Sequence, residues 1–359
     1  DLSTSVLEWR AAVDAGALLG PRIFTSGPKI EGRDSIWPGD TEIGTRDELM
    51  AALDRLEAQR VDFVKLTDDK LSPELFLLGV REATKRGLIT SAHIPMGVTL
   101  DEASAAGLRS IEHLGYLLRG GAPRESEIAA RFRAGTLTPA QASQAIEDSF
   151  DAAVARASFA RLAARGIAVT PTLNGSRVVA YLDRDDHAKD PYLKYIGPGL
   201  RATYAWRVER AARDDAAAIR RRHARYEATA ALLPLLSQAG VTILAGTDAG
   251  FLNSFDYPGI GLHDELGLFV AAGLSPLEAL RAATVNGARF LGHVGESGSL
   301  EAGKRADIVL LNANPLVDIG ATRQIDAVVL AGRLLRRGDL DDLLAQAARR
   351  VAQLSAPAP

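Results

Sequence analysis

Short apolar runs alternate along the chain with longer amphipathic stretches, and this alternation constrains the possible folds more than any other feature. Residues 61–66, a β-branched and aromatic run, are typical of a buried strand. The stretch before this run opens with Thr45 and Glu48 in the spacing of a capping box, which predicts a helix start. The same reasoning predicts six strands in all, at residues 23–26, 61–66, 88–93, 110–113, 167–173 and 241–248.

Strands that alternate with helices form a parallel sheet covered by those helices. A doubly wound open sheet usually carries a G-x-G-x-x-G turn after an early strand, and this sequence contains none. A (β/α) barrel instead gathers its reactive groups at the carboxyl ends of several strands. Reactive side chains stand at or just before four predicted strand ends, namely Lys65, His93, His113 and Asp248. The pattern therefore favours a (β/α) barrel.

The sequence changes character near residue 297, where short apolar runs separated by glycine turns replace the alternation of strands and helices. Such runs predict short antiparallel strands. We therefore expect a (β/α) barrel over residues 1–296, a small β appendage over 297–338, and a C-terminal helix and tail over 339–359.

Composition excludes several kinds of partner and chemistry. Hydrophobic residues make up 47% and charged residues 24%, as in ordinary globular domains. The net charge of −3 predicts neither nucleic acid nor an anionic membrane as a partner, and no apolar run reaches the roughly 18 residues that span a bilayer. The absence of cysteine excludes disulfides, thiolate ligands and a cysteine nucleophile. The composition does not distinguish a cytoplasmic protein from one that is periplasmic or secreted after removal of a leader.

Histidines at two successive strand ends predict a metal site. His93 and His113 would lie at the same rim of a parallel sheet, and imidazole nitrogens are ligands that Zn²⁺ accepts readily. Asp248 could bind the same ion or take a proton from its bound water. Hydrogen-bonded structural histidines are an equally weighted alternative.

Three further residues are candidates, and two of them have an ordinary structural alternative. Lys65 would be repelled by a cation unless it were neutral or converted by CO₂ into an anionic carbamate. Taken alone, Lys65 is better explained as the salt-bridge partner of Asp68 or Asp69. Tyr116 could reach a substrate or an oxyanion. His263 could orient a metal ligand without contacting the metal itself. An equal alternative is that the residues around it cap the start of a helix.

Eight segments, taken in order, resemble the metal-dependent amidohydrolase superfamily, in particular its imidazolonepropionase-like and prolidase-like branch. One such motif would be weak, but the ordered set is specific and extends over almost the whole sequence. The matching segments are residues 20–27, 62–65, 91–93, 110–114, 244–250, 262–266, 273–280 and 303–307.

The resemblance implies a (β/α)₈ TIM-like barrel with a small β-sandwich built from both chain ends. It also implies a centre of two metal ions, usually zinc, with other divalent metals as alternatives. On this view Lys65 is the carbamylated bridging ligand on strand four, while His93 and His113 are ligands on strands five and six. Asp248, on strand eight, would bind the other ion and shuttle the proton. The catalytic residues expected are therefore Asp248, Tyr116 and His263.

One departure from the superfamily pattern is serious. The superfamily carries a His-x-His pair on its first strand, and this sequence contains no such pair. Strands 1 and 2 of the barrel and the N-terminal half of the sandwich also have no counterpart, so the sequence would supply strands 3–8. We therefore expect a preceding segment, on another polypeptide or outside the given sequence, that supplies the His-x-His strand.

The expected function is hydrolysis of an amide C–N bond in a small substrate, such as a dipeptide or an N-acyl amino acid, by a metal-bridging hydroxide. One alternative is a mononuclear deaminase or a cyclic amidine or imidazolone hydrolase, against which Lys65 argues because such relatives typically lack it. Another is a non-catalytic binding or scaffold protein of the same fold. The expected partners are the small-molecule substrate and further copies of the chain in a homo-oligomer.

Overall fold

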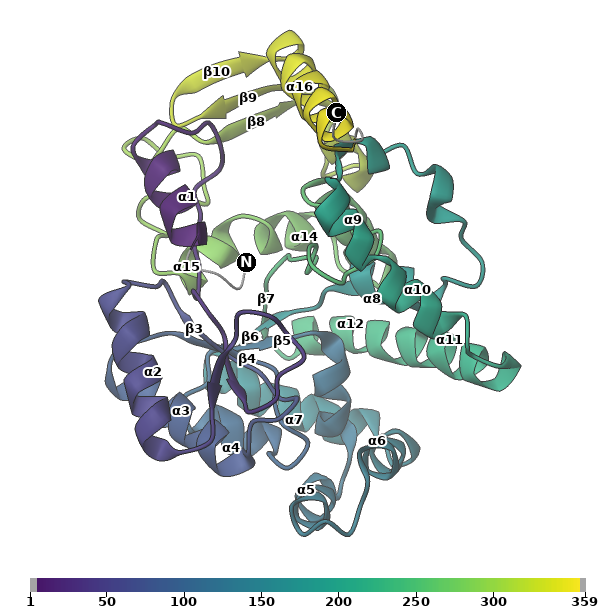
Figure 1. Ribbon diagram of the computed structural model, residues 1–359. Coiled ribbons are helices and arrows are strands. Elements are labelled where there is room, and N and C mark those ends of the chain that lie inside the picture. The colour runs from purple at the N-terminus through teal and green to yellow at the C-terminus, as the bar shows by residue number, and fades with distance from the viewer. Residues whose placement is uncertain (1–4, 356–359) are drawn as a thin grey trace. The chain divides into compact units, whose positions relative to one another are not determined.

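The computed structural model describes residues 5–355, which form two compact units (Figure 1). Within the described residues, unit 1 consists of 5–170 and 235–243, and unit 2 consists of 171–234 and 244–355. The first four and the last four residues, which include the end of the predicted C-terminal tail, lie outside the described residues.

Unit 1 contains a parallel sheet of seven short strands in the order β2-β1-β3-β4-β5-β6-β7. Every pair of neighbours in this order is parallel. The strands are β1 (Ile30–Gly32), β2 (Thr41–Ile43), β3 (Val64–Leu66), β4 (Thr90–Ala92), β5 (Ser110–Glu112), β6 (Ala168–Thr170) and β7 (Thr242–Ile243). The predicted α/β class with a parallel sheet is confirmed.

The strand predicted at residues 23–26 is absent. The first two strands of the structure, β1 and β2, lie further along the chain, where the sequence predicted none. Residues 23–26 form no strand. Thr25 is instead bound to Asp62, whose carboxylate accepts from the Thr25 amide at 2.7 Å and whose own amide donates to the Thr25 carbonyl at 2.9 Å. Gly27 then turns the chain with a φ of 59°. Sequence periodicity does not reveal β1 and β2, because each has three residues with a glutamate at its centre.

Local sequence signals set the helix starts of unit 1. The predicted capping box at Thr45 and Glu48 is confirmed at the start of α2 (Arg46–Ala58). Thr99 and Glu102 form a second capping box at α4 (Leu100–Ala105). Helices α2, α3 and α4 follow one another along the outside of the strands (Figure 1). The other helical segments are α1 (Ser5–Asp14), α3 (Pro73–Lys85), η1 (Leu114–Gly121), α5 (Glu125–Arg133), α6 (Pro139–Asp148) and α7 (Ala152–Ala164). The helix before β7, α12 (Leu232–Gln238), has its first three residues in unit 2 and the rest in unit 1.

The core of unit 1 combines fully buried side chains from the strands and from the helices. Ile30, Leu66 and Ile111 on the strands are 0% exposed, as are Leu53 and Phe76 on the helices. Burying one such side chain contributes about 1.5–3 kcal/mol. The strand ends are therefore firmly positioned, and with them the residues that follow each strand.

Unit 2 combines helices with a three-stranded antiparallel sheet of order β10-β9-β8. These strands lie within the predicted β appendage, and α16 (Arg337–Ser355) contacts β9 and β10 (Figure 1). The predicted limits 1–296, 297–338 and 339–359 stay predictions. The elements of unit 2 are α8 (Leu173–Ala180), η2 (His187–Lys189), η3 (Leu193–Tyr195), α9 (Pro198–Thr203), α10 (Ala205–Ala211), α11 (Ala216–Ala230), α13 (Ile260–Ala271), α14 (Pro276–Ala282), α15 (Val285–Phe290), β8 (Ile308–Leu311), η4 (Ile319–Arg323), β9 (Ile325–Leu330), β10 (Arg333–Arg336) and α16. None of the helices within residues 5–355 has the length and apolar character needed to cross a bilayer.

Candidate active site

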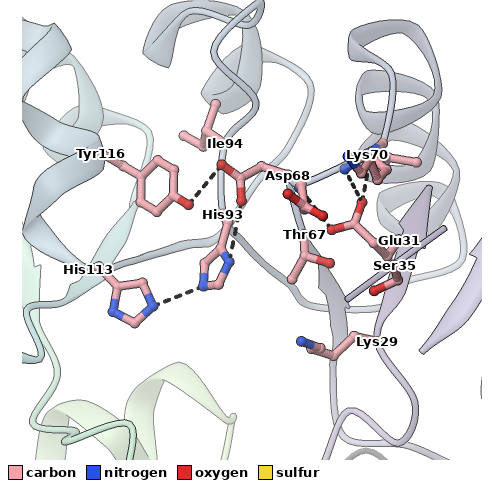
Figure 2. Close-up of polar contacts among 12 residues, drawn as sticks. Lys29, Glu31, Ser35, Thr67, Asp68, Lys70, His93, Ile94, His113 and Tyr116 are labelled. Carbon is pink, nitrogen blue, oxygen red and sulfur yellow. Dashed lines mark hydrogen bonds and ion pairs between the residues drawn. The ribbon is translucent and has the colours of Figure 1, made fainter. Parts of the chain in front are cut away.

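His93 and His113 come together at the carboxyl ends of two neighbouring strands. Each histidine directly follows its strand, β4 or β5. The His93 amide donates to the Leu66 carbonyl at 3.0 Å and the His113 amide to the Thr170 carbonyl at 2.8 Å, so both residues are still held by the sheet. The Nε2 atoms of the two imidazoles lie 3.0 Å apart (Figure 2). The sheet thus directs two predicted ligand atoms at each other.

A buried arginine connects the segments that follow the two histidines. His113 has a φ of 66°, a left-handed conformation that costs a non-glycine residue about 1–2 kcal/mol. Arg119, in η1 directly after His113, is only 5% exposed. Its guanidinium donates to three carbonyls in the loop after His93, those of Ile94 at 3.2 Å, Pro95 at 2.9 Å and Val98 at 2.8 Å. This clamp helps to hold both histidines in place.

Replacing Arg119 by methionine is expected to lower the free energy of unfolding by about 3 kcal/mol or more. Each of three buried carbonyls loses its hydrogen-bond donor, and each loss costs about 1–3 kcal/mol. Denaturant unfolding followed by circular dichroism measures the loss. Arg131→Met is the matched control, since the Arg131 side chain is 49% exposed and makes an ion pair with Glu127 at 3.8 Å. The control should change stability by less than about 1 kcal/mol. Equal losses in the two variants would contradict the clamp.

Lys65, on β3, acts electrostatically on two neighbouring strand ends. Burial first, and the charge of Lys65 second, lower the pKa of His93 well below its usual value of 6.5. Burial alone would raise the pKa of Glu112, but the charge of Lys65 and hydrogen bonds from nearby hydroxyls outweigh burial and lower that pKa. Lys65 therefore lies in the field of Glu112, a partner that the sequence did not indicate. The carbamate stays a prediction.

Tyr116 contacts the histidine pair and a carboxylate. Its hydroxyl donates to Asp68 Oδ2 at 2.8 Å, and its ring stacks on that of His93 with centroids 5.4 Å apart (Figure 2). Burial raises the pKa of Asp68 to about 6, although the hydrogen bond from Tyr116 opposes this shift. Burial and the Asp68 charge also raise the pKa of the Tyr116 hydroxyl, so this group stays protonated. Tyr116 is therefore a protonated donor at the rim whose one hydrogen goes to Asp68, so binding an oxyanion would require it to leave Asp68.

Asp248 belongs to unit 2, where a hydrogen-bonded chain orients its carboxylate. The Asn253 side-chain amide donates to Asp248 Oδ2 at 2.8 Å and also to the Asp248 carbonyl. The Asn253 amide oxygen in turn accepts from Arg207 at 2.5 Å. Because arginine can only donate, Arg207 determines which end of the Asn253 amide faces Asp248. No sequence signal indicates Asn253 or Arg207, because the two residues are 46 positions apart in the sequence.

His263 is the fourth residue of α13 in unit 2, and its Nδ1 lies 3.0 Å from Thr322 Oγ1. Burial lowers the pKa of its imidazole, followed by the charge of Arg323. The alternative of helix capping by a neighbouring side chain finds no support, because the N-cap is Gly259. Lys65, His93, His113 and Tyr116 belong to unit 1, whereas Asp248 and His263 belong to unit 2. A site composed of both sets stays a prediction.

The spacing of the two histidine nitrogens fits a pair of ligands on one divalent ion. Ligand nitrogens lie about 2.0–2.1 Å from zinc, so two of them on one ion are separated by roughly 3–3.5 Å. The observed 3.0 Å between the Nε2 atoms is close to that separation. Within residues 5–355 no group of three or more His, Asp or Glu side chains could hold an ion, so the histidine pair needs further ligands of another kind. A carbamate at Lys65 would be one such ligand.

A parallel α/β sheet with imidazoles directly after adjacent strands defines a class of enzyme that builds its site at the carboxyl ends of the strands. The chain belongs to the amidohydrolase family, whose model matches residues 2–335. This match confirms the resemblance found in the sequence.

Individual relatives match shorter parts of the chain. An imidazolonepropionase of Rubrobacter xylanophilus is 66% identical over 41 residues, which are 11% of this chain and 10% of that protein. An ochratoxinase of Aspergillus niger is 39% identical over 93 residues, or 25% of this chain and 18% of that protein. The chain thus matches less than a fifth of the length of either curated relative. The solved structure of a bottromycin amidohydrolase is 25% identical, covers 97% of this chain and 72% of its own, and has a TM-score of 0.73.

Proposed function

We propose that this protein hydrolyses an amide C–N bond in a small substrate, such as a dipeptide or an N-acyl amino acid, with the help of divalent metal ions. The observation that carries the proposal is the pair of Nε2 atoms 3.0 Å apart at the ends of β4 and β5. Such a pair binds metal readily when both rings are neutral, and burial keeps His93 neutral by lowering its pKa. Membership of the amidohydrolase family supports the same chemistry.

His93 and His113 would hold a metal ion together with Lys65 as its carbamate, and Asp248 would hold a second ion. Zn²⁺ is the ion that we propose, because it accepts both imidazole and oxygen ligands. A bound ion of this kind supplies Lewis-acid chemistry at the amide carbonyl.

The protein's own residues would bind the substrate and move the proton. Asp248 would take a proton from the attacking water and give it to the leaving amine, which needs a carboxylate held in one orientation. The amide of Asn253, fixed by Arg207, provides that orientation. Tyr116 would donate its hydroxyl hydrogen to the carbonyl oxygen by exchanging the bond that it makes to Asp68 for one to the substrate. His263 would act through its contact with Thr322 rather than on the substrate.

Hydrolysis of a C–N bond within a ring is a second candidate. It is favoured by the 66% identity with an imidazolonepropionase, although this likeness extends over only 41 residues. Both candidates require a polarised carbon and an activated water, so the substrate distinguishes them better than the site does.

A substrate screen on the purified chain tests these proposals. The panel contains dipeptides, N-acyl amino acids and cyclic imidazolones, each assayed after chelation and again after addition of Zn²⁺. We expect amine release from the open-chain amides, loss of activity after chelation, recovery with Zn²⁺, and about two ions per chain by elemental analysis. Turnover of the cyclic substrates alone would favour the second candidate. Zinc binding without turnover of any substrate would favour a binding protein.

A further inference from the structure

Asp68 lies between two residues of the candidate site and contacts both. It follows β3 by two positions, and its side chain is 26% exposed. One carboxylate oxygen accepts from the Tyr116 hydroxyl at 2.8 Å, and the other lies 3.6 Å from His93 Nδ1 (Figure 2). The Asp68 carboxylate thus lies near Nδ1 of His93 and near the hydroxyl of Tyr116, whose ring stacks on that of His93.

The contact with His93 concerns the nitrogen that faces away from the candidate ion. His93 directs Nε2 toward His113 and Nδ1 toward Asp68. A ligand histidine keeps its proton on the nitrogen remote from the metal and usually donates it to a carboxylate or a carbonyl. The 3.6 Å separation is longer than a hydrogen bond of up to about 3.2 Å, so the two groups must approach by about 0.4 Å for the bond to form.

Glu31 on β1 fixes the loop that carries Asp68. Its side chain is fully buried, and its two carboxylate oxygens accept four backbone N–H groups (Figure 2). The donors are the amides of Gly32 at 2.7 Å, Asp69 at 2.9 Å, Lys70 at 3.0 Å and Leu71 at 2.8 Å. Gly32 permits this approach, because a Cβ there would lie 2.2 Å from the Lys70 carbonyl oxygen. The loop is therefore held by the sheet, independently of any ion.

We infer that Asp68 is a positioning residue, which holds the His93 proton on Nδ1 and so presents the Nε2 lone pair to the ion site, while Glu31 holds Asp68. This inference rests on the proposed function, because it takes His93 as a ligand. It assigns the Asp68 carboxylate to His93 and Tyr116, while the charge of Lys65 also acts on it and opposes the rise of its pKa on burial. In the metal-free protein, His93 Nε2 then accepts the hydrogen bond and His113 Nε2 donates it across the 3.0 Å gap.

Zinc affinity of Asp68→Asn and Asp68→Ala tests the inference, measured by competition with a chromophoric chelator. We expect affinity to fall roughly 10- to 100-fold in both variants, as when other outer partners of ligand histidines are removed. Asp69→Asn is the matched control, since it removes a carboxylate charge from the same loop at an exposed position and leaves the Asp69 amide bound to Glu31. Its affinity should stay within about threefold of wild type.

Two further measurements keep the outcomes separate. Glu31→Gln leaves Asp68 intact but weakens its anchor, so zinc affinity should fall in the same direction, and thermal unfolding shows whether each variant is folded. In the metal-free protein, ¹⁵N shifts of the His93 ring, assigned with His93→Gln, should show the Nδ1–H tautomer and lose it in Asp68→Ala. Wild-type protein that binds no zinc would overturn the proposed function. Wild-type protein that binds zinc, with unchanged affinity and tautomer in the Asp68 variants, would overturn this inference alone.

Discussion

Asp248→Asn is expected to lower kcat by about 10²–10⁴-fold and to change KM little, because asparagine keeps the shape of the side chain but cannot carry a proton between water and the leaving amine. The amide can still accept the hydrogen bond from Asn253, so the loop should keep its conformation. Steady-state kinetics on the best substrate of the screen measures the effect, with zinc content determined in parallel because Asp248 is also a proposed ligand.

Asp256→Asn is the matched control for Asp248→Asn. Asp256 lies in the same loop of unit 2 and is fully buried, and burial raises its pKa to about 7. One of its oxygens accepts from the Asn174 side chain at 2.8 Å, a bond that an amide oxygen can also accept. Because asparagine mimics the protonated acid, this variant should keep kcat within a few-fold of wild type. If Asp248→Asn kept kcat at the level of Asp256→Asn, proton transfer by Asp248 would be ruled out.

Features that depend on neighbouring residues could be predicted from the sequence. The capping box at Thr45 needs only a glutamate three positions later, and the structure contains it. The histidine pair could be predicted because each residue ends an apolar run, and parallel strands bring such ends to one edge.

Features that depend on distant residues could not be predicted in this way. Glu31 looks like a surface residue in the sequence, yet it is buried because the amides that it binds come mostly from a loop almost forty positions away. The role of Asp68 depends on Tyr116, which lies 48 positions further on. Residues 23–26 have the composition of a strand, but the Asp62 carboxylate takes the Thr25 amide and a ladder does not form. In each case the deciding hydrogen bond involves a side chain that lies tens of positions away in the sequence.

Lys65→Met is expected to lower zinc affinity by more than about 100-fold and to abolish measurable turnover, since losing even an outer partner of a ligand typically costs 10–100-fold. In the metal-free protein, where Lys65 is an unmodified ammonium, the variant also removes the charge that lowers the pKa of Glu112, so the protonated form of that buried carboxyl becomes easier to populate and stability should fall. A loss of zinc could therefore reflect a damaged fold rather than a missing ligand.

The double variant Lys65→Met/Glu112→Gln separates these two causes. Glutamine removes the uncompensated charge and keeps an acceptor for the Ser91 and Ser110 hydroxyls, so stability should recover while zinc affinity stays low. In wild type, a carbamate makes metal loading depend on CO₂, so reconstitution in CO₂-free buffer should fail and added bicarbonate should restore it. If the double variant bound zinc as wild type does, or if bicarbonate made no difference, Lys65 would act only through its charge and the bridging carbamate would be excluded.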